Sequence, residues 1–218
     1  MDKRAILRKT TARAHDHHNG EASGHDWWHI QRVRRLALHI QEREGGDRFV
    51  IELAALLHDI ADYKLNGNGD VHAGARAARA WLASLGTDSG VVDHVAEIIG
   101  SMSWKAAKVR ARMRTIEGKI VQDADRLDAM GAIGIARVFA YGGYKGRVLH
   151  DPGIVPQVHT SFEEYCASGG ATITHIYERI LWHRTHLNTA TARRIAKDRH
   201  AFILLFLKRF HKEWDGKA

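Results

Sequence analysis

The sequence predicts an all-α protein from three observations. Apolar residues recur at helical spacing in several long segments. Only two prolines, Pro152 and Pro156, interrupt the 218 residues, so long helices can form. No alternating strand pattern, heptad array or internal repeat competes with this reading. Because a chain of this length with 44% hydrophobic residues can bury one substantial core, we expect a single domain over residues 1–218.

The first two helical patterns lie next to each other in the chain. The segment HIQRVRRLALHIQERE starts at His29, carries an apolar stripe and ends at Gly45-Gly46. The segment DRFVIELAALLHDIAD follows, with Asp47 as the expected N-cap, and it ends in His58 and Asp59. Further helices are expected over residues 72–86, where Gly86 would be the C-cap, and over 89–102, 115–141, and two segments after residue 173 separated near Asn188-Thr189.

Residues 142–170 contain both prolines and several glycines, and this composition predicts a long ordered loop. Long loops in compact domains often cover a site, so we interpret this segment as a loop or lid. The most apolar stretch, AFILLFL at residues 201–207, is far shorter than the roughly 20 residues of a membrane helix. We therefore expect it to be a core helix, and we expect no membrane span.

The formal net charge of +8 biases the surface towards anionic partners such as nucleotides or nucleic acid. The most basic stretch is SWKAAKVRARMR at residues 103–114, although charge runs more often form a solvated helix face. The single cysteine, Cys166, excludes an internal disulfide framework, and the first residues lack the apolar block of a secretory signal. We expect a cytoplasmic location.

The apolar run LAALLHDIAD ends in a histidine and an aspartate, although buried charge is costly unless it is paired or bound to a metal. If this helix faces the core, its last turn brings His58 and Asp59 to the interior edge, where they could share a cation. Further ligands would have to come from other buried helix faces. His29, one turn before an apolar-stripe valine, and Asp125, in KIVQDADRLDAMGAIG, are the candidates.

Several neighbouring residues compete for these roles. Asp123 should point away from the face that carries Asp125, whereas Asp128, one turn further on, could orient a ligand through a hydrogen bond. His25 precedes His29 by one turn, but it is not included because the segment before the helix need not keep helical register. The other histidines near the start, which are His15, His17 and His18, are expected to form a hydrated polar segment.

The order His29, then His58-Asp59, then Asp125 resembles the pattern of the HD-domain superfamily of metal-dependent phosphohydrolases. Four segments carry a closer resemblance to its small bacterial YpgQ/YedJ-like branch: GHDWWHIQRV, LAALLHDIAD, IVQDADRLDAMGAIGIAR and HLNTATARRIAKDRHAFILLFLKRFHKEWDG. Together they extend over Gly24–Gly216, nearly the whole chain. The resemblance implies an all-α HD-domain bundle in which His29, His58, Asp59 and Asp125 hold one divalent metal ion.

Two imidazoles and two carboxylates suit manganese, with Fe, Co, Ni, Zn or Mg as alternatives. The resemblance implies a nucleotide phosphohydrolase, and it favours a (d)NTP pyrophosphohydrolase that releases (d)NMP and pyrophosphate. A nucleoside 5′-monophosphatase is the alternative enzyme. The alternative of another class is a basic nucleic-acid-binding or regulatory protein with a structural metal, and the sequence leaves monomer and homodimer open.

Asp62, one turn after His58, occupies the position that in several related phosphohydrolases holds an acid serving the attacking water, and it is the expected general base. A triphosphate needs cations beyond one divalent ion, which makes Lys64, Lys105 and Arg137 candidates for phosphate contacts. The remaining candidates, for phosphate contacts or an expanded metal site, are His72 and His94.

Other chemistries lack their motifs. The sequence contains no G-x-x-x-x-G-K-[ST], G-x-G-x-x-G, H-E-x-x-H, C-x-x-C or G-x-S-x-G. Cys166 has no recognisable catalytic partner, and a lone cysteine of this kind is usually inert. Trp27 and Trp28 could stack on a nucleobase, but packing is the expected role.

Overall fold

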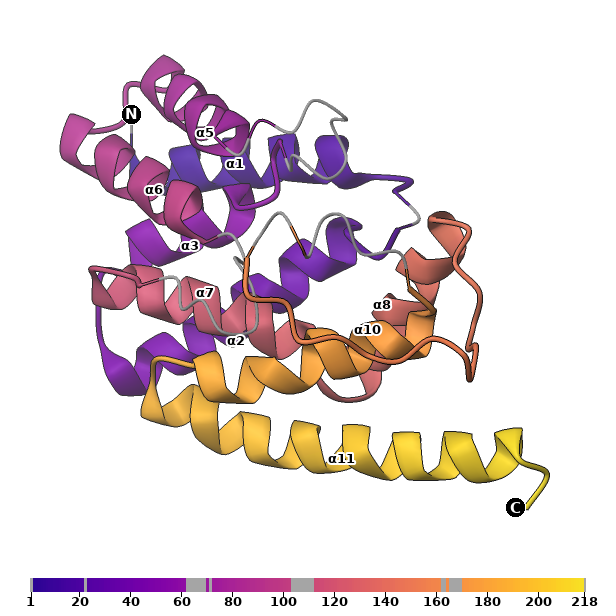
Figure 1. Ribbon diagram of the computed structural model, residues 1–218. Helices are drawn as coiled ribbons and strands as arrows, with labels where there is room; N and C mark the ends of the chain where they lie inside the picture. Colours follow the sequence, from indigo (N-terminus) through magenta and orange to yellow (C-terminus); the bar gives the residue numbers. More distant parts are fainter. Residues whose placement is uncertain are drawn as a thin grey trace.

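The structure is a computed structural model that describes residues 2–21, 23–61, 70, 72–102, 112–161, 164 and 170–217. In this part of the chain it is all-α and contains no strand, as the sequence predicts (Figure 1). The elements are α1 (Lys3–His18), α2 (Trp27–Glu44), α3 (Arg48–Leu57), α5 (Ala73–Ser84), α6 (Ser89–Ser101), α7 (Ile116–Asp128), α8 (Gly131–Tyr144), α10 (Thr172–Glu178), the 3-10 helix η1 (Ile180–His186) and α11 (Ala190–Trp214).

Helix α3 lies at the centre of the bundle. Every residue from Phe49 to Leu57 is buried, because α1, α2, α6 and α7 all pack against this helix. Eight of these nine residues are therefore apolar, and the exception, Glu52, is paired with Arg34 and Arg48. The chain therefore leaves α3 still inside the protein, and the next residue, His58, is buried too.

Side-chain caps fix the two ends of the α2–α3 connection. The Asp26 side chain accepts a hydrogen bond from the backbone N–H of His29, and the Asp47 side chain accepts from the backbone N–H groups of Phe49 and Val50. Between the two helices, Gly45 has a φ of 82°, a conformation that favours glycine and ends α2. The predicted end of α2 at Gly45 and the predicted N-cap at Asp47 are confirmed. Helix α2 begins two residues before His29, and α3 ends at Leu57, so that His58 and Asp59 follow the helix and do not lie in its last turn.

The prediction of one helix over residues 115–141 is wrong, because the chain forms two helices there. Helix α7 ends at Asp128 and α8 begins at Gly131, whose φ of 74° cannot continue a right-handed helix. A second glycine makes the junction compact, since a Cβ at Gly134 would lie 2.2 Å from the carbonyl oxygen of Ala129. The two glycines therefore place Asp128 in the last turn of α7, beside the start of α8.

We expect Gly134→Ala to destabilise the protein by about 3 kcal/mol, because the added methyl group must push the α7–α8 junction apart. For a chain of this size, such a loss lowers the melting temperature by about 6–12 °C. Thermal unfolding followed by circular dichroism measures the effect. Gly143→Ala is the matched control, since a Cβ there meets nothing within 4 Å. Equal melting temperatures for the two variants would contradict the close approach.

The segment predicted as a loop from Gly142 to Gly170 begins later than expected, because α8 continues to Tyr144. The described residues 147–161 that follow contain no helix, but residues 162–163 and 165–169 lie outside the described part of the chain. The lid role of this segment therefore stays a prediction. The C-terminal region breaks at residues 187–189, as predicted, between η1 and α11.

Helix α11 runs along one side of the molecule and packs against α2, α7, α8 and η1 (Figure 1). Ile203 and Leu207 are buried against the core, whereas Phe202, Leu204 and Leu205 are exposed. The prediction of a core helix at residues 201–207 is therefore wrong for four of its apolar side chains, since Ala201 is exposed as well. None of the helices among the described residues has the length and apolar character required to cross a bilayer.

Candidate metal centre

Four side chains from three helix ends converge at one point, where His29 and His58 are buried and the Asp125 side chain is 37% exposed. His29 lies in the first turn of α2, His58 and Asp59 directly follow α3, and Asp125 lies in the last turn of α7. The Nε2 atoms of His29 and His58 are 3.2 Å apart. Asp59 Oδ2 lies 3.4 and 3.5 Å from these two nitrogens, and Asp125 Oδ1 lies 3.7 and 3.9 Å from them. We call these four residues the His–Asp cluster.

The outer nitrogen of each imidazole is occupied by the protein. Nδ1 of His58 lies 2.9 Å from the carbonyl oxygen of Ala55, and a carbonyl can only accept, so Nδ1 carries the proton. Nδ1 of His29 donates to Oδ2 of Asp128 across 2.8 Å. In their neutral forms, both rings therefore direct an Nε2 lone pair towards the same point, which is the arrangement a metal-ligating histidine requires.

Asp128 is the partner that orients His29. It is only 1% exposed, and it also accepts hydrogen bonds from Arg32 at 2.8 Å and from Arg137 at 3.2 Å. Burial raises the pKa of this carboxyl, but the hydrogen bonds from His29 and Arg32 and the charge of Arg137 outweigh it, so the pKa lies below its ordinary value. Asp128 is thus an ionised acceptor behind the cluster, in the orienting position that the sequence suggested.

Arg137 is held in the same network. Its Nη1 donates to Asp128, and its Nε donates to the carbonyl oxygen of Gly24 across 2.7 Å. These contacts tie the segment before α2 to α8 and keep a positive charge behind His29. A phosphate contact by Arg137 stays a prediction.

His25, which is not one of the predicted metal ligands, contacts the cluster directly. Its Nδ1 donates to Oδ2 of Asp59 across 2.9 Å, and its ring packs edge-on against the ring of His29. Burial raises the pKa of Asp59, but the positive charge that His58 carries when it is protonated and the hydrogen bond from His25 hold it well below the ordinary value. The only sequence signal for His25 was its spacing of four residues from His29.

The prediction of a hydrated histidine segment is wrong for His18. This residue is 1% exposed and donates from Nδ1 to the carbonyl oxygen of His25 across 3.0 Å, whereas His15 and His17 are exposed. Burial lowers the pKa of His18 to about 4, and the nearby negative charge of Asp59 only partly opposes this. The end of α1 therefore supports the backbone that carries His25.

Asp123 faces away from the cluster, as its spacing from Asp125 predicts. Its carboxylate is fully buried and accepts hydrogen bonds from the backbone N–H groups of Asn188 at 2.8 Å and Thr189 at 2.7 Å. Burial raises the pKa of Asp123, and these hydrogen bonds only partly lower it. Asp123 thus joins α7 to the start of α11.

The structure does not bring His94 near the cluster. Its Nε2 lies 2.9 Å from Oγ1 of Thr115, at the start of α7, whereas Asp125 lies about 15 Å further along that helix. His72 is exposed and directly precedes α5. Predicted residues that lie outside the described part of the chain are Asp62, Lys64, Lys105, Cys166 and most of the basic stretch at 103–114.

The two tryptophans beside His29 behave differently. Trp27 packs against the small cluster of Ala14, Ile30 and Leu56, which agrees with the expected packing role. Trp28 is 61% exposed, so its ring is accessible to solvent.

The donor set of the His–Asp cluster fits a divalent transition-metal ion. Ligand atoms about 2.1 Å from one ion lie roughly 3.0–3.4 Å apart around it, and the donor pairs given above lie 3.2–3.9 Å apart. A contraction of a few tenths of an ångström would bring them onto one ion. Mixed imidazole and carboxylate donors suit Mn, Fe, Co, Ni and Zn better than Mg.

An all-α bundle with His, His-Asp and Asp donors on three helix ends defines the class of protein. Residues 27–130 match the family model described as the HD domain. The chain belongs to the HD-domain family, whose hydrolases are in general metal-dependent phosphohydrolases.

Its relatives extend the match over nearly the whole chain. The Bacillus subtilis (strain 168) protein YpgQ is 39% identical over 197 residues, which are 90% of this chain and 87% of YpgQ. A solved HD-superfamily hydrolase from Bacillus thuringiensis is 41% identical with a TM-score of 0.73, covering 98% of this chain and 99% of that one. A Lactobacillus plantarum structure has a TM-score of 0.87 at 32% identity and covers 99% and 100% of the two chains. The structure of YpgQ in complex with ADP has a TM-score of 0.73 at 34% identity and covers 100% of both.

Proposed function

We propose that this protein is a nucleotide pyrophosphohydrolase that converts nucleoside triphosphates, deoxy forms in particular, to the monophosphate and pyrophosphate. The observation that carries the proposal is the convergence of the His29 and His58 Nε2 atoms with carboxylate oxygens of Asp59 and Asp125. The ADP bound to the relative YpgQ supports a nucleotide as the substrate class.

In this proposal the His–Asp cluster holds one divalent ion, with Mn²⁺ as the first choice. A divalent ion in such a site supplies Lewis acidity, because it withdraws charge from a phosphoryl oxygen and lowers the pKa of water. Asp128 and the backbone carbonyl of Ala55 keep the two imidazoles oriented, so the ring positions are fixed before substrate arrives.

The hydrolysis forms a bond between a water oxygen and the α-phosphorus and breaks the bond from that phosphorus to the oxygen bridging to the β-phosphate. Asp62 is the proposed general base that takes a proton from the water, since it follows His58 by four residues. Cations beyond the metal ion would neutralise the leaving pyrophosphate. The side chains proposed for substrate contacts are Lys64, Lys105, Arg137 and His72.

The test is to incubate the Mn²⁺-loaded protein with a panel of dNTPs, NTPs and dNMPs and to identify the products by ion-exchange chromatography. We expect equimolar monophosphate and pyrophosphate from the triphosphates. Release of orthophosphate from dNMPs alone would replace this function by a 5′-monophosphatase.

Absence of turnover with every substrate, repeated with Fe, Co, Ni, Zn and Mg, would overturn the proposal. DNA binding that weakens steeply with salt would then favour the nucleic-acid-binding alternative. The chain carries a net charge of +8, so some salt-sensitive DNA binding is expected in any case, and only its combination with absent turnover counts.

A further inference from the structure

Two cations at the end of α8, Lys145 and Arg147, gather on the same aromatic ring. Lys145 Nζ lies 5.7 Å and Arg147 Cζ lies 5.8 Å from the centre of the Tyr141 ring, and Lys145 Nζ also lies 5.3 Å from the ring of Tyr144. Among the residues that the structure describes, no carboxylate lies within ion-pair distance of either cation. We call Lys145 and Arg147 the α8 cation pair.

The backbone that carries this pair is rigid. The N–H of Arg147 donates to the carbonyl of Gly142 at 2.8 Å, and the N–H of Gly146 donates to that of Gly143 at 3.0 Å, with Gly146 at a φ of 66°. This pattern is a Schellman cap, which fixes the two residues on either side of its glycine. The segment is also tied to α10, because Val148 accepts a hydrogen bond from Thr172 at 2.9 Å.

Gly142 allows α8 and α10 to approach each other closely. A Cβ at this position would lie 2.3 Å from Oγ1 of Thr172, so no larger residue fits without a shift. The two positive charges are thus held near each other by the fold as well as by the ring. Two cations that have no carboxylate partner among the described residues repel each other, and a bound anion relieves that repulsion.

The α8 cation pair is linked to the candidate metal centre through two aromatic rings. The ring of Tyr141 is 6.3 Å from the ring of His25, measured between centroids, and His25 donates its Nδ1 hydrogen to Asp59. The rings of Tyr141 and His25 therefore connect the pair to Asp59 of the His–Asp cluster. A ligand that is anchored at the cluster and carries several negative charges can extend towards both cations.

We propose that Lys145 and Arg147, supported by Tyr141, bind the two terminal phosphates of the nucleoside triphosphate, which leave as pyrophosphate; this inference rests on the proposed function. A pyrophosphate carries enough charge for two cations, and the planar Arg147 guanidinium matches phosphate oxygens in a bidentate manner. Base stacking on Tyr141 is disfavoured, because cations already contact this ring.

The test measures binding of inorganic pyrophosphate and of orthophosphate to the metal-free full-length protein by isothermal titration calorimetry at low salt. We expect pyrophosphate to bind more tightly than orthophosphate. Lys145→Ala and Arg147→Ala should each weaken pyrophosphate binding about tenfold, since each removes a hydrogen bond to a charged group. Arg147→Lys should retain part of the affinity, because it keeps the charge and loses the planar fork.

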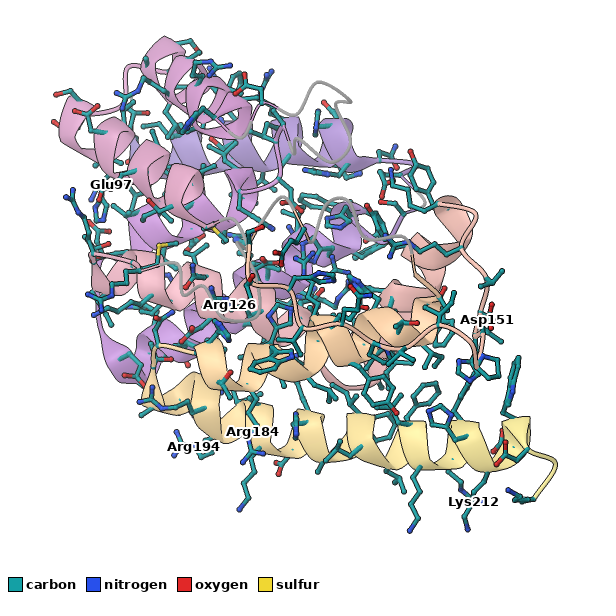
Figure 2. All side chains as sticks on the ribbon, viewed as in Figure 1. Glu97, Arg126, Asp151, Arg184, Arg194 and Lys212 are labelled. Atoms are coloured by element: carbon teal, nitrogen blue, oxygen red, sulfur yellow. The ribbon has the colours of Figure 1, made fainter. Side chains whose placement is uncertain are left out.

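Arg194→Ala combined with Lys197→Ala is the matched control, as both residues are exposed cations on α11. Figure 2 shows Arg194 on the opposite side of the molecule from Asp151, which follows Arg147 by four residues. The control pair should leave pyrophosphate affinity unchanged. An equal loss in this control would reduce the effect to net charge and overturn the site.

Unchanged pyrophosphate affinity in both single variants, or absence of pyrophosphate binding to the wild-type protein, would also overturn the inference. These outcomes are distinguishable from failure of the proposed function. Absent triphosphate turnover with intact, Lys145-dependent pyrophosphate binding would reject the reaction and keep the anion site. Turnover with no effect of the α8 variants on pyrophosphate binding would keep the reaction and reject the site.

Discussion

Asp59→Ala is expected to abolish both divalent-metal binding and triphosphate turnover while leaving the helices folded. The variant removes one of the four converging metal donors and also the acceptor for His25. Without this carboxylate, two imidazoles and Asp125 remain, and we expect turnover to fall at least about a thousandfold, as for loss of a group that acts on the transition state. Metal content after dialysis against Mn²⁺, turnover and far-ultraviolet circular dichroism are the measurements.

The sequence offers a matched control for this variant, because the His-Asp dipeptide also occurs at His15-Asp16. The Asp16 side chain is 82% exposed and contacts only its neighbour His15 among the ion pairs of the described residues. Asp16→Ala should therefore retain wild-type metal content and turnover. Full turnover in Asp59→Ala would show that the metal site has been assigned to the wrong residues.

The second large effect is expected from Asp128→Asn, which should weaken metal binding about 10- to 100-fold although Asp128 belongs to no donor pair of the cluster. The neutral amide no longer holds the imidazole of His29 as an ionised acceptor does, and it leaves Arg32 and Arg137 without their charged partner. Competition with a metal-binding dye gives the affinity, and thermal unfolding of the metal-free protein gives the accompanying loss of stability.

Glu52→Gln separates orientation of a ligand from general destabilisation. Glu52 is also a buried carboxylate bound by two arginines, Arg34 and Arg48, but it does not contact the His–Asp cluster. This control should lower thermal stability with little effect on metal affinity. If Asp128→Asn behaved in the same way, Asp128 would have a purely structural role.

Most of the fold could be predicted because its signals are local. The caps at Asp47 and Gly45 depend on hydrogen bonds and backbone angles within a few residues, and the structure confirms both. The break at Gly131 was missed because an apolar helical pattern continues across it, and a glycine inside such a pattern does not by itself reveal a positive φ. The exposure of Leu204 and Leu205 depends on which side of α11 the other helices cover, which periodicity cannot show.

The candidate site could be predicted only in part, for a related reason. Convergence of His29, His58, Asp59 and Asp125 was expected, and the distances between their atoms agree with it. His25 was missed because it precedes the N-cap of α2, where helical spacing no longer determines direction, and its position depends on contacts with residues far away in the sequence.

Asp123 and Asp125 lie two residues apart on α7. Asp123 accepts hydrogen bonds from Asn188 and Thr189, whereas Asp125 faces the other donor atoms of the His–Asp cluster. Asn188 and Thr189 lie beyond the matched HD-domain residues 27–130, and their hydrogen bonds to Asp123 couple this part of the chain to the turn of α7 that carries Asp125. A substitution at residues 187–189 is therefore expected to change how firmly the Asp125 side chain is held towards the other donor atoms. Helix α11 therefore stabilises the turn of α7 that carries Asp125, and this role requires no contact between α11 and a ligand.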